Sequence, residues 1–342
     1  LAALVRNGEI SPTELLDTAL ARIEVRDGQI NAVVTSMEDE ARQAIQAGLP
    51  DGPFTGVPFA LKDLNVHFAG VPTTNGSQIF ADFVPDEDAT LVTRYKQAGL
   101  VILGKTNTPE LGLAATTEPA LHGATHNPWN LEYSSGGSSG GASTPVAAGY
   151  MPMAHATDGG GSIRIPASMS GLFGLKPSRG RMPQGPIVGE GLGGMGTAHC
   201  VSRSVRDSAA LLDATHGPAP GDPYFAPPMD TRYLDEVGAP VGRLKIALCT
   251  KDFTGAPLSK ACADAAIAAA RLCESLGHQV EEARPPLDDL PLSRAWRVVP
   301  AANLWNAVSA RARALGREPQ PGDVEPVTWE WMQQGRTLSA AD

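Results

Sequence analysis

Glycine is concentrated in one stretch of this 342-residue sequence, between Ser134 and Cys200. Seventeen of the 37 glycines fall in these 67 residues, where an even spread would place about seven. Glycine weakens the interior of helices and strands, but it lets the backbone turn sharply and approach a ligand closely. The stretch therefore predicts tight turns around a functional site.

Strands and helices are expected to alternate on both sides of this stretch. Ser11, Pro12 and Glu14 form a capping box with proline at the first helical position, and residues 15–24 continue at helical spacing. Hydrophobic periodicity and terminal glycines give the remaining expectations. Before the stretch these are a strand at 30–34, a helix at 38–48, a strand at 56–63, a helix at 88–99 and a strand at 100–104.

After the stretch, the same reasoning predicts a helix at 204–217 and an irregular, proline-rich connection at 218–240. A strand–helix–strand unit follows at 243–249, 259–277 and 278–283, and then a long helix at 293–316 with a kink at Pro300. Such alternation is typical of layered α/β proteins.

The composition excludes several classes of function. The chain is 42% hydrophobic and 19% charged, as folded proteins are, and its net charge of −10 disfavours general nucleic-acid binding. Its longest apolar run is shorter than a membrane span, and Arg6 and Glu9 interrupt any signal-peptide pattern at the start. The four cysteines form no C-x-x-C pair, so we expect buried free thiols and a cytoplasmic location. The acidic charge balance leads us to expect a small-molecule partner.

Two short motifs match known functional patterns but lack the structural context that those patterns need. Residues 99–106 (GLVILGKT) fit the phosphate-binding loop, yet the four apolar residues in the middle predict a strand rather than a flexible loop. Residues 136–140 (GGSSG) fit the nucleophile elbow of α/β-hydrolases, which needs a strand leading in and a histidine base. The preceding residues look loop-like, and His155, His199, His216 and His278 all lie in ordinary contexts.

A third set of residues has the types that acyl transfer needs. Ser162 follows three glycines, Ser138 lies between two glycine pairs, and Lys62 ends an apolar strand. Serine with a lysine base is a known variant of the catalytic triad, provided that burial keeps the lysine neutral. Taken singly, the glycines are more typical of a turn, and the lysine is more typical of a surface side chain.

In order along the chain, these segments resemble the amidase signature family. The resemblance rests on six motifs, namely VPFALKD, LGKTNTPELG, GATHNPWNL, GGSSGGAS, TDGGGSIRIPAS and GLFGLKPSRGR, and it covers about residues 1–290. It implies an α/β/α fold with a central mixed, twisted sheet covered by helices. Within the family, TTEPALHGATHNPWNL and WEWMQQGR are most similar to hydrolases of a cyclic amide dimer and related bacterial amidases.

The resemblance implies a Ser–cis-Ser–Lys triad and hydrolysis of linear or cyclic amides through an acyl-enzyme. Ser162 matches the nucleophile, Ser138 the bridging serine after a cis peptide bond, and Lys62 the base. The backbone N–H groups of Gly159 to Ser162, with Gly160 and Gly161 between them, match the oxyanion hole. No metal or organic cofactor is implied.

Further positions are also implied by family position alone. Ser139 matches a supporting hydrogen-bonding residue, Asp158 and Arg164 match residues that hold the loop, and the residues near Gly112 and Leu113 match the acyl pocket. Many members carry a larger residue where this chain has Gly159, so we expect a looser oxyanion loop.

Two alternatives of different classes stay open at the level of sequence. One is a glutamyl/aspartyl-tRNA amidotransferase A-type subunit, although this chain has Thr108–Leu111 where that subunit usually carries a Met-Asp-Glu-Phe type segment. The other is a catalytically silent fragment of the same fold. We expect one domain over residues 1–342 with its core at about 56–205, incomplete at the C-terminus, and a homodimer as a candidate assembly.

Overall fold

The computed structural model describes residues 1–186, 188–252, 255–285 and 289–339. Its contacts divide the chain into two compact units. The larger unit joins Leu1–Val237 to the described residues from Ala301 onward, and the smaller one is Gly238–Pro300. The single domain over 1–342 stays a prediction, because a division by contacts does not measure independent folding.

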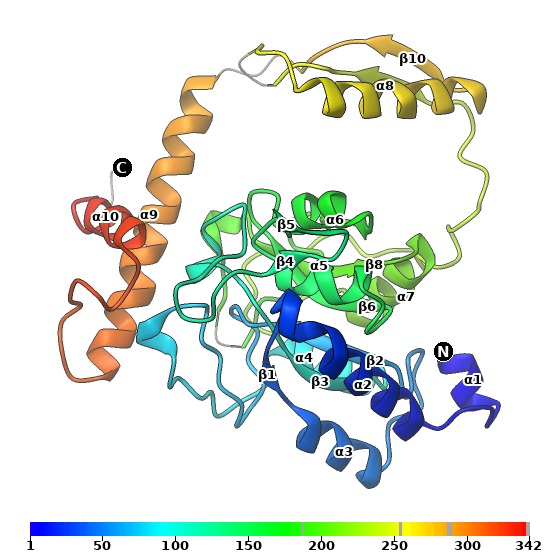
Figure 1. The fold of residues 1–342 in the computed structure, drawn as a ribbon. Coiled ribbons are helices and arrows are strands. Elements are labelled where there is room, and N and C mark those ends of the chain that lie inside the picture. Colours follow the sequence, from blue (N-terminus) through cyan, green and yellow to red (C-terminus); the bar gives the residue numbers. More distant parts are fainter. Residues whose placement is uncertain (187, 253–254, 286–288, 340–342) are drawn as a thin grey trace. The chain divides into compact units, whose positions relative to one another are not determined.

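The elements before the glycine-rich stretch largely follow the sequence predictions (Figure 1). They are α1 (Ala2–Arg6), α2 (Pro12–Ile30), β1 (Val33–Ser36), α3 (Glu38–Ala47), β2 (Pro58–Lys62), η1 (Gln78–Phe80), α4 (Thr90–Gln97), β3 (Val101–Thr106) and η2 (Glu110–Gly112). The capping box is confirmed, since Ser11 Oγ accepts the Glu14 N–H at 3.2 Å and Glu14 Oε2 accepts the Ser11 N–H at 2.8 Å. Ile30 is the last residue of α2 and not the start of a strand, because Asn31 ends the helix in a left-handed conformation at φ 56°.

The glycine-rich stretch and the residues just before it form more regular structure than expected. The elements are β4 (His126–Asn127), β5 (Asn130–Ser134), α5 (Gly140–Ala147), β6 (Met153–Asp158), α6 (Arg164–Ser170), β7 (Phe173–Gly174), η3 (Leu192–Gly194) and β8 (Thr197–Ser202). The prediction of a loop just before residue 136 is wrong. A ribbon of β4 and β5 leads into the serine-rich turn, since their backbones pair with each other.

Two three-stranded sheets lie side by side at the centre of the larger unit. In one, β3 pairs in parallel with β2 and antiparallel with β1, and in the other β8 pairs antiparallel with β6 and β7. The sheets meet where β2 contacts β6. The mixed α/β architecture is therefore as expected from the sequence.

Alternate residues of the central strands face two separate apolar cores. Phe59 of β2 packs with helices α4 and α7 (Val205–Thr215), whereas its neighbour Ala60 packs with helices α2 and α5. A strand with helices on both faces is buried throughout, which explains why all five residues of β2 are buried. Lys62 at the end of β2 is therefore placed in the interior.

The predictions for the C-terminal part are also confirmed in outline. The smaller unit pairs β9 (Lys245–Leu248) in parallel with β10 (Gln279–Glu282), and α8 (Lys260–Ser275) packs against both strands. Helix α9 (Asp289–Ala314) continues through Pro300, and α10 (Pro326–Arg336) follows it. The residues 218–240 contain no helix or strand. The kink at Pro300 stays a prediction.

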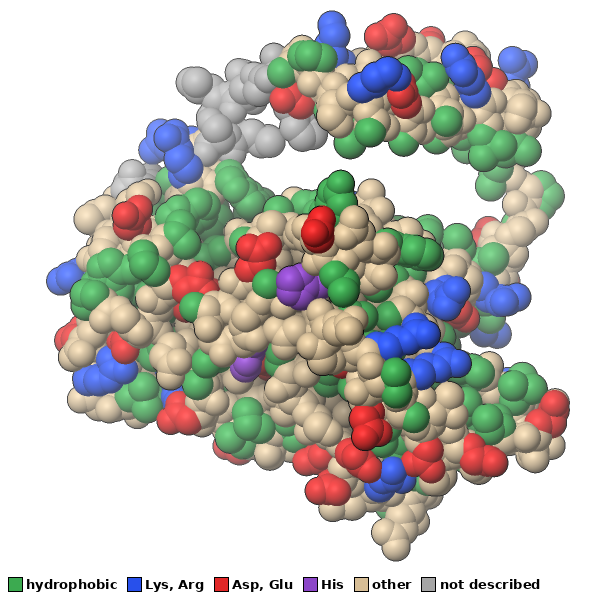
Figure 2. All heavy atoms as spheres, viewed as in Figure 1, with side chains coloured by type: hydrophobic (Ala, Val, Ile, Leu, Met, Phe, Trp, Pro, Cys, Tyr) green, Lys and Arg blue, Asp and Glu red, His purple; other side chains and the backbone are tan. Residues whose placement is uncertain are grey.

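Three features of the structure bear on what the composition led us to expect. In the described residues, no helix combines the length and the apolar character that crossing a membrane requires. All four cysteines are free, but only Cys200 is buried, so the expectation of buried thiols is wrong for Cys249, Cys262 and Cys273. Acidic and basic side chains are interspersed on the face in Figure 2.

Candidate active site

Lys62 lies at the end of β2 with its whole side chain buried. Its Nζ donates a hydrogen bond to Ser138 Oγ at 2.6 Å and a second one to Thr157 Oγ1 at 2.9 Å. Its backbone N–H donates to His155 Nδ1 at 3.2 Å. The sequence prediction that Lys62 and Ser138 lie together therefore agrees with the geometry, although 76 residues separate them.

The environment of Lys62 favours its neutral form. Burial lowers the pKa of Lys62 to about 7, against an opposing effect of the Asp158 carboxylate. An ammonium group loses its hydration when it is buried, so the uncharged amine is favoured. A neutral amine close to a serine hydroxyl can accept a proton.

Ser138 follows a cis peptide bond, Gly137–Ser138, as the family resemblance implies. The glycines around the two serines are required by close packing. A Cβ on Gly137 would lie 2.3 Å from the Thr116 carbonyl oxygen, and one on Gly141 would lie 2.4 Å from the backbone of Asn107. The turn is thus pressed against two neighbouring segments, which fixes the position of Ser138.

Ser139 supports the same turn from the other side. Its Oγ accepts the backbone N–H of Thr157 and donates to the Thr157 carbonyl oxygen, both at 3.3 Å. These bonds tie the start of α5 to the end of β6. Ser139 therefore lies where a supporting hydrogen-bonding residue was expected.

Asp158 organises the turn that carries the three glycines and Ser162. Its carboxylate accepts the N–H groups of Gly161 at 2.8 Å and Ile163 at 3.2 Å. Arg164 adds bonds from Nε at 2.9 Å and from a terminal nitrogen at 3.0 Å. Although burial opposes it, these hydrogen bonds hold the pKa of Asp158 below its ordinary value. These bonds join Asp158 and Arg164 to the turn, and their supporting role in the site stays a prediction.

One of the four backbone N–H groups between Gly159 and Ser162 is already bonded inside the protein. The Gly161 N–H points at Asp158 and is already used, while Gly161 itself adopts φ 130°, a conformation that favours glycine. The remaining backbone donors of the segment are those of Gly159, Gly160 and Ser162. The oxyanion role expected for this segment stays a prediction, and these three N–H groups are the ones left available for it.

Ser162 lies in the turn before α6 and is half-buried. Within the residues that the structure describes, its hydroxyl makes no hydrogen bond, either to Ser138 or to any other group. The structure thus brings Lys62 and Ser138 together, while the link from Ser138 to Ser162 is left open.

Two residues of this site were missed by sequence reasoning. Thr157 and His155 both contact Lys62, and both lie on β6, the strand that ends at Asp158. Burial lowers the pKa of His155 to about 3, and the nearby basic groups of Lys62, His199 and Lys105 act in the same direction, so the ring is neutral. Recognising β6 as a strand that enters the glycine turn would have placed both residues near the site.

The other sequence matches remain outside this site. Residues Val101–Thr106 form β3, so the apparent phosphate-binding loop is a strand, as predicted. His199 bonds to Ser208 at 2.7 Å, and no histidine in the described residues contacts the hydroxyl of Ser138 or Ser162. In the same described residues, no three His, Cys, Asp or Glu side chains gather as a metal site would require.

The space beside Ser138 is bordered by the segment expected to form the acyl pocket. A Cβ on Gly112 would lie 3.4 Å from Ser138 Oγ, so the Gly112 backbone adjoins this hydroxyl. Next to it, Leu111 and Leu113 pack against an apolar cluster that includes Leu304 of α9 and Met332 of α10. The side of the site nearest Gly112 is therefore apolar.

The chain is similar to proteins that act on amides. A family model described as Amidase matches residues 14–340. The chain is 41% identical over 350 residues to the 6-aminohexanoate-cyclic-dimer hydrolase of Paenarthrobacter ureafaciens, covering 99% of this chain and 71% of that protein. It is 35% identical over 325 residues to the A-type subunit of the glutamyl-tRNA(Gln) amidotransferase of Halothermothrix orenii, covering 94% of this chain and 67% of that protein.

A solved structure extends the likeness to three dimensions. The structure of a 6-aminohexanoate cyclic dimer hydrolase complexed with substrate superposes with a TM-score of 0.94 at 39% identity. The match covers 99% of this chain and 71% of the other.

Proposed function

Because the chain belongs to the Amidase family, we propose that it hydrolyses amides through an acyl-enzyme formed on Ser162. Its relatives include amide hydrolases, and the chain is an amidase that cleaves carbon–nitrogen bonds. The resemblance seen in the sequence is confirmed, and so is the expected fold class. The roles of the individual residues are the part that we propose.

The proposed reaction begins with proton transfer along the triad. Neutral Lys62 takes a proton from Ser138, Ser138 takes one from Ser162, and the Ser162 oxygen attacks the amide carbonyl carbon. Ser138 then gives a proton to the leaving nitrogen and regains one from the Lys62 ammonium group, and the carbon–nitrogen bond breaks. Water attacks the resulting ester, releases the carboxylic acid and restores the Ser162 hydroxyl.

The backbone N–H groups of Gly159, Gly160 and Ser162 are the proposed oxyanion donors. Asp158 supports this role because it holds the turn by hydrogen bonds to other backbone groups without using these three. One preorganised donor of this kind contributes about 3–4 kcal/mol to stabilising the transition state.

One observation carries the proposal, namely the contact of 2.6 Å between Lys62 Nζ and Ser138 Oγ in a buried environment. A buried lysine is costly unless it has a task or an anionic partner. Lys62 makes two hydrogen bonds to hydroxyl groups, and neither partner is a carboxylate. This arrangement suits a lysine that must be neutral to act as a base.

The substrate that we propose is a small linear or cyclic amide. The similarity to a cyclic-dimer hydrolase and the apolar side of the site near Gly112 both support it. We further propose a cytoplasmic enzyme, in keeping with its four free cysteines, and a small molecule rather than a nucleic acid as its partner, given the net charge of −10. A homodimer is the assembly to be tested, by sedimentation velocity of the full chain.

The test of the nucleophile is Ser162→Ala, measured by amine release from a panel of aliphatic, aryl, peptide and lactam amides. We expect activity to fall by about 10⁴-fold or more with little change in melting temperature. Ser168→Ala is a matched control, since Ser168 is an exposed serine of α6 in the same region, and it should retain full activity. Retention of activity by Ser162→Ala would exclude this nucleophile.

The amidotransferase alternative predicts a different result. Glutaminase activity that appears only with an added partner protein, and no turnover of the amide panel, would favour it over the amidase. The silent alternative predicts that a sulfonyl fluoride probe fails to label Ser162 in the folded chain. The higher identity to the cyclic-dimer hydrolase than to the amidotransferase favours the amidase.

A further inference from the structure

The space beside Gly159 is occupied by a side chain from another part of the chain. A Cβ placed on Gly159 would lie only 2.6 Å from Leu192 Cδ2, and the next nearest atoms belong to Gly196 and to Leu192 again. The Leu192 side chain therefore packs directly against the Gly159 backbone. Leu192 occupies the place that a larger residue at position 159 would take, and the looser oxyanion loop expected from this glycine stays a prediction.

Leu192 belongs to a glycine-rich loop, residues 189–196, that is folded tightly on itself. The Gly191 carbonyl oxygen accepts the N–H of Gly194 at 3.1 Å and the N–H of Gly196 at 3.2 Å. Leu192 adopts φ 53°, the left-handed region that non-glycine residues rarely occupy. Such a conformation persists only where the surroundings hold it, so the placement of Leu192 is enforced by the loop.

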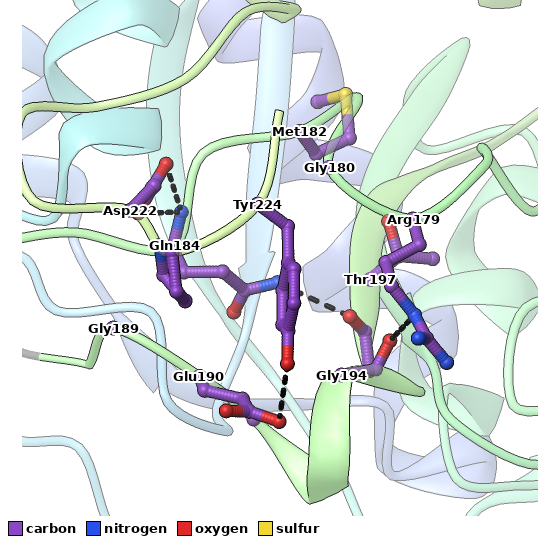
Figure 3. Close-up of a pocket in the computed structure, with 13 residues that line it drawn as sticks. Arg179, Gly180, Met182, Gln184, Gly189, Glu190, Gly194, Thr197, Asp222 and Tyr224 are labelled. Carbon is purple, nitrogen blue, oxygen red and sulfur yellow. Dashed lines mark hydrogen bonds between the residues drawn. The ribbon is translucent and has the colours of Figure 1, made fainter. Parts of the chain in front are cut away.

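Side chains behind the loop hold it in place (Figure 3). Arg179 Nε donates to the Gly194 carbonyl oxygen at 2.8 Å, and Gln184 Nε2 donates to the Gly196 carbonyl oxygen at 3.1 Å. The Arg179 guanidinium also lies over the Tyr224 ring, 5.7 Å from its centre. A Cβ on Gly194 would lie 3.2 Å from both Arg179 and Tyr224, so the fit leaves no spare room.

We propose that Leu192 is a positioning residue for the oxyanion donors: it packs on Gly159 and fixes the path of the turn that carries the N–H groups of Gly159 and Gly160. This inference rests on the proposed function, because it assigns the same turn its role. Backbone donors stabilise an oxyanion best when they are fixed in advance, since no reorganisation is then needed during the reaction. Leu192 acts through the backbone and takes no part in proton transfer.

A double-mutant cycle of Gly159→Ala and Leu192→Ala tests the pairing. In Gly159→Ala the new methyl group displaces the flexible Leu192 side chain. In Leu192→Ala the Gly159 backbone loses the side chain that packs against it. We expect each single variant to lose about tenfold in kcat with KM changed less than about threefold. In the double variant the methyl group added at position 159 takes part of the space of Leu192, so its loss should be well below the product of the two single losses.

Two controls separate positioning from general damage. Met195→Ala removes another half-buried side chain of the same loop that is not among the nearest neighbours of Gly159, and it should retain kcat. Leu192→Met conserves volume and should also retain most of the rate. The melting temperatures of Met195→Ala and Leu192→Ala should fall by similar amounts, although only Leu192→Ala loses activity.

Hydrogen exchange gives a readout that does not depend on turnover. Gly161 is buried and its N–H is bonded to Asp158, so its exchange reports how often the turn opens. We expect the Gly161 amide to exchange at least about tenfold faster in Leu192→Ala than in the parent or in Met195→Ala, because the turn opens more often. Independent losses in the cycle, or unchanged exchange at Gly161, would overturn the inference. A parent chain whose Ser162→Ala variant stays active would instead overturn the proposed function, so the two failures are distinguishable.

Discussion

At the scale of single residues, the site depends on one amine that must lose its charge. Lys62 lies close to Asp158 and His155 of β6 and to Ser138, which follows the cis peptide bond. Asp158 favours the charged amine, while burial opposes it and prevails. The pKa of about 7 that results leaves Lys62 available as a base near neutral pH.

We expect kcat/KM to rise with pH through about 7 and then to level off, because only the neutral form of Lys62 accepts a proton. Thr157→Val tests this assignment. The Thr157 hydroxyl accepts a hydrogen bond from Nζ and stabilises the ammonium form most, so its removal lowers the pKa of Lys62 further. The rising limb should move to lower pH while kcat falls by about tenfold.

A pH–rate profile measured on both proteins checks this prediction. Lys105 is the other buried lysine nearby, with a pKa lowered by burial to about 8 and opposed by Asp63. It donates to Thr73 and does not contact Thr157, so a limb that belonged to Lys105 would stay in place in Thr157→Val. A limb that stays or moves to higher pH contradicts the assignment.

A second prediction at this scale concerns His155, whose Nδ1 accepts the backbone N–H of Lys62. His155→Leu leaves that buried N–H unpaired, which costs about 1–3 kcal/mol, and it frees the end of β2 to shift. We expect kcat to fall by about tenfold or more, whereas His155→Asn keeps an acceptor near the position of Nδ1 and should recover most of the rate.

The matched control is His199→Leu. His199 is also fully buried and bonds to Ser208, but it does not contact Lys62. Thermal melts and steady-state kinetics should show a similar loss of stability in both leucine variants and a loss of kcat only in His155→Leu. Equal kinetic losses in the two would mean that His155 has no special role.

At the scale of elements, the connection from β6 to α6 is held by one carboxylate. Asp158 is fully buried and accepts both backbone and Arg164 hydrogen bonds, whereas 54% of the Arg164 side chain is exposed. We predict that Asp158→Asn destabilises the fold by about 2–3 kcal/mol, and that Arg164→Ala costs less than about 1 kcal/mol.

The pH dependence of this loss has a definite sign. The folded chain lowers the pKa of Asp158 below 3.8, so the stabilisation is complete above that value and is lost as the pH falls through the folded pKa. Urea unfolding of the parent and of Asp158→Asn should therefore differ at pH 7 and converge at strongly acidic pH. A difference that persists there would show that the carboxylate charge is not the cause.

Regular elements with strong local patterns were predictable from the sequence, and those inside the glycine-rich stretch were not. Helix α2 has its capping box and β2 has its apolar run, so both follow from local rules. Helix α5 contains Gly140, Gly141 and Pro145, which are poor helix formers, and it exists because it is buried between α6 and the strands. Burial of this kind depends on the assembled fold.

The site shows the same limit. Local chemistry pointed to Lys62, Ser138 and Ser162 as suitable types, but their assembly came from the family resemblance, because no local rule joins residues so far apart in sequence. Leu192 was out of reach altogether, since its contact with Gly159 depends on the path of a distant loop.

At the scale of the whole molecule, the segment after residue 301 packs onto earlier parts of the larger unit. Ile79 donates its N–H to the Asp323 carbonyl oxygen at 3.0 Å, and Glu110 accepts the Glu325 N–H at 2.8 Å. An apolar cluster of η1, α9 and α10 surrounds these bonds. The segment after residue 301 therefore stabilises the same unit that carries the candidate triad.

The smaller unit, Gly238–Pro300, has far less to hold it together. Among the described residues of α8, only Ala270 is buried, whereas β2 and β3 are buried throughout. Because local stability follows buried apolar contact, we predict that the α8 amides open at a cost below about 3 kcal/mol, while β3 approaches the full stability of about 5–15 kcal/mol. Native-state hydrogen exchange measures both.

A matched pair of variants tests the role of Ala270. Ala270→Gly should speed exchange in α8 more than the exposed control Ala269→Gly does, since both variants lose helix propensity but only Ala270→Gly loses packing. Protection in β3 should stay the same in both variants. Protection in α8 as strong as that in β3 would mean that the two units unfold as one.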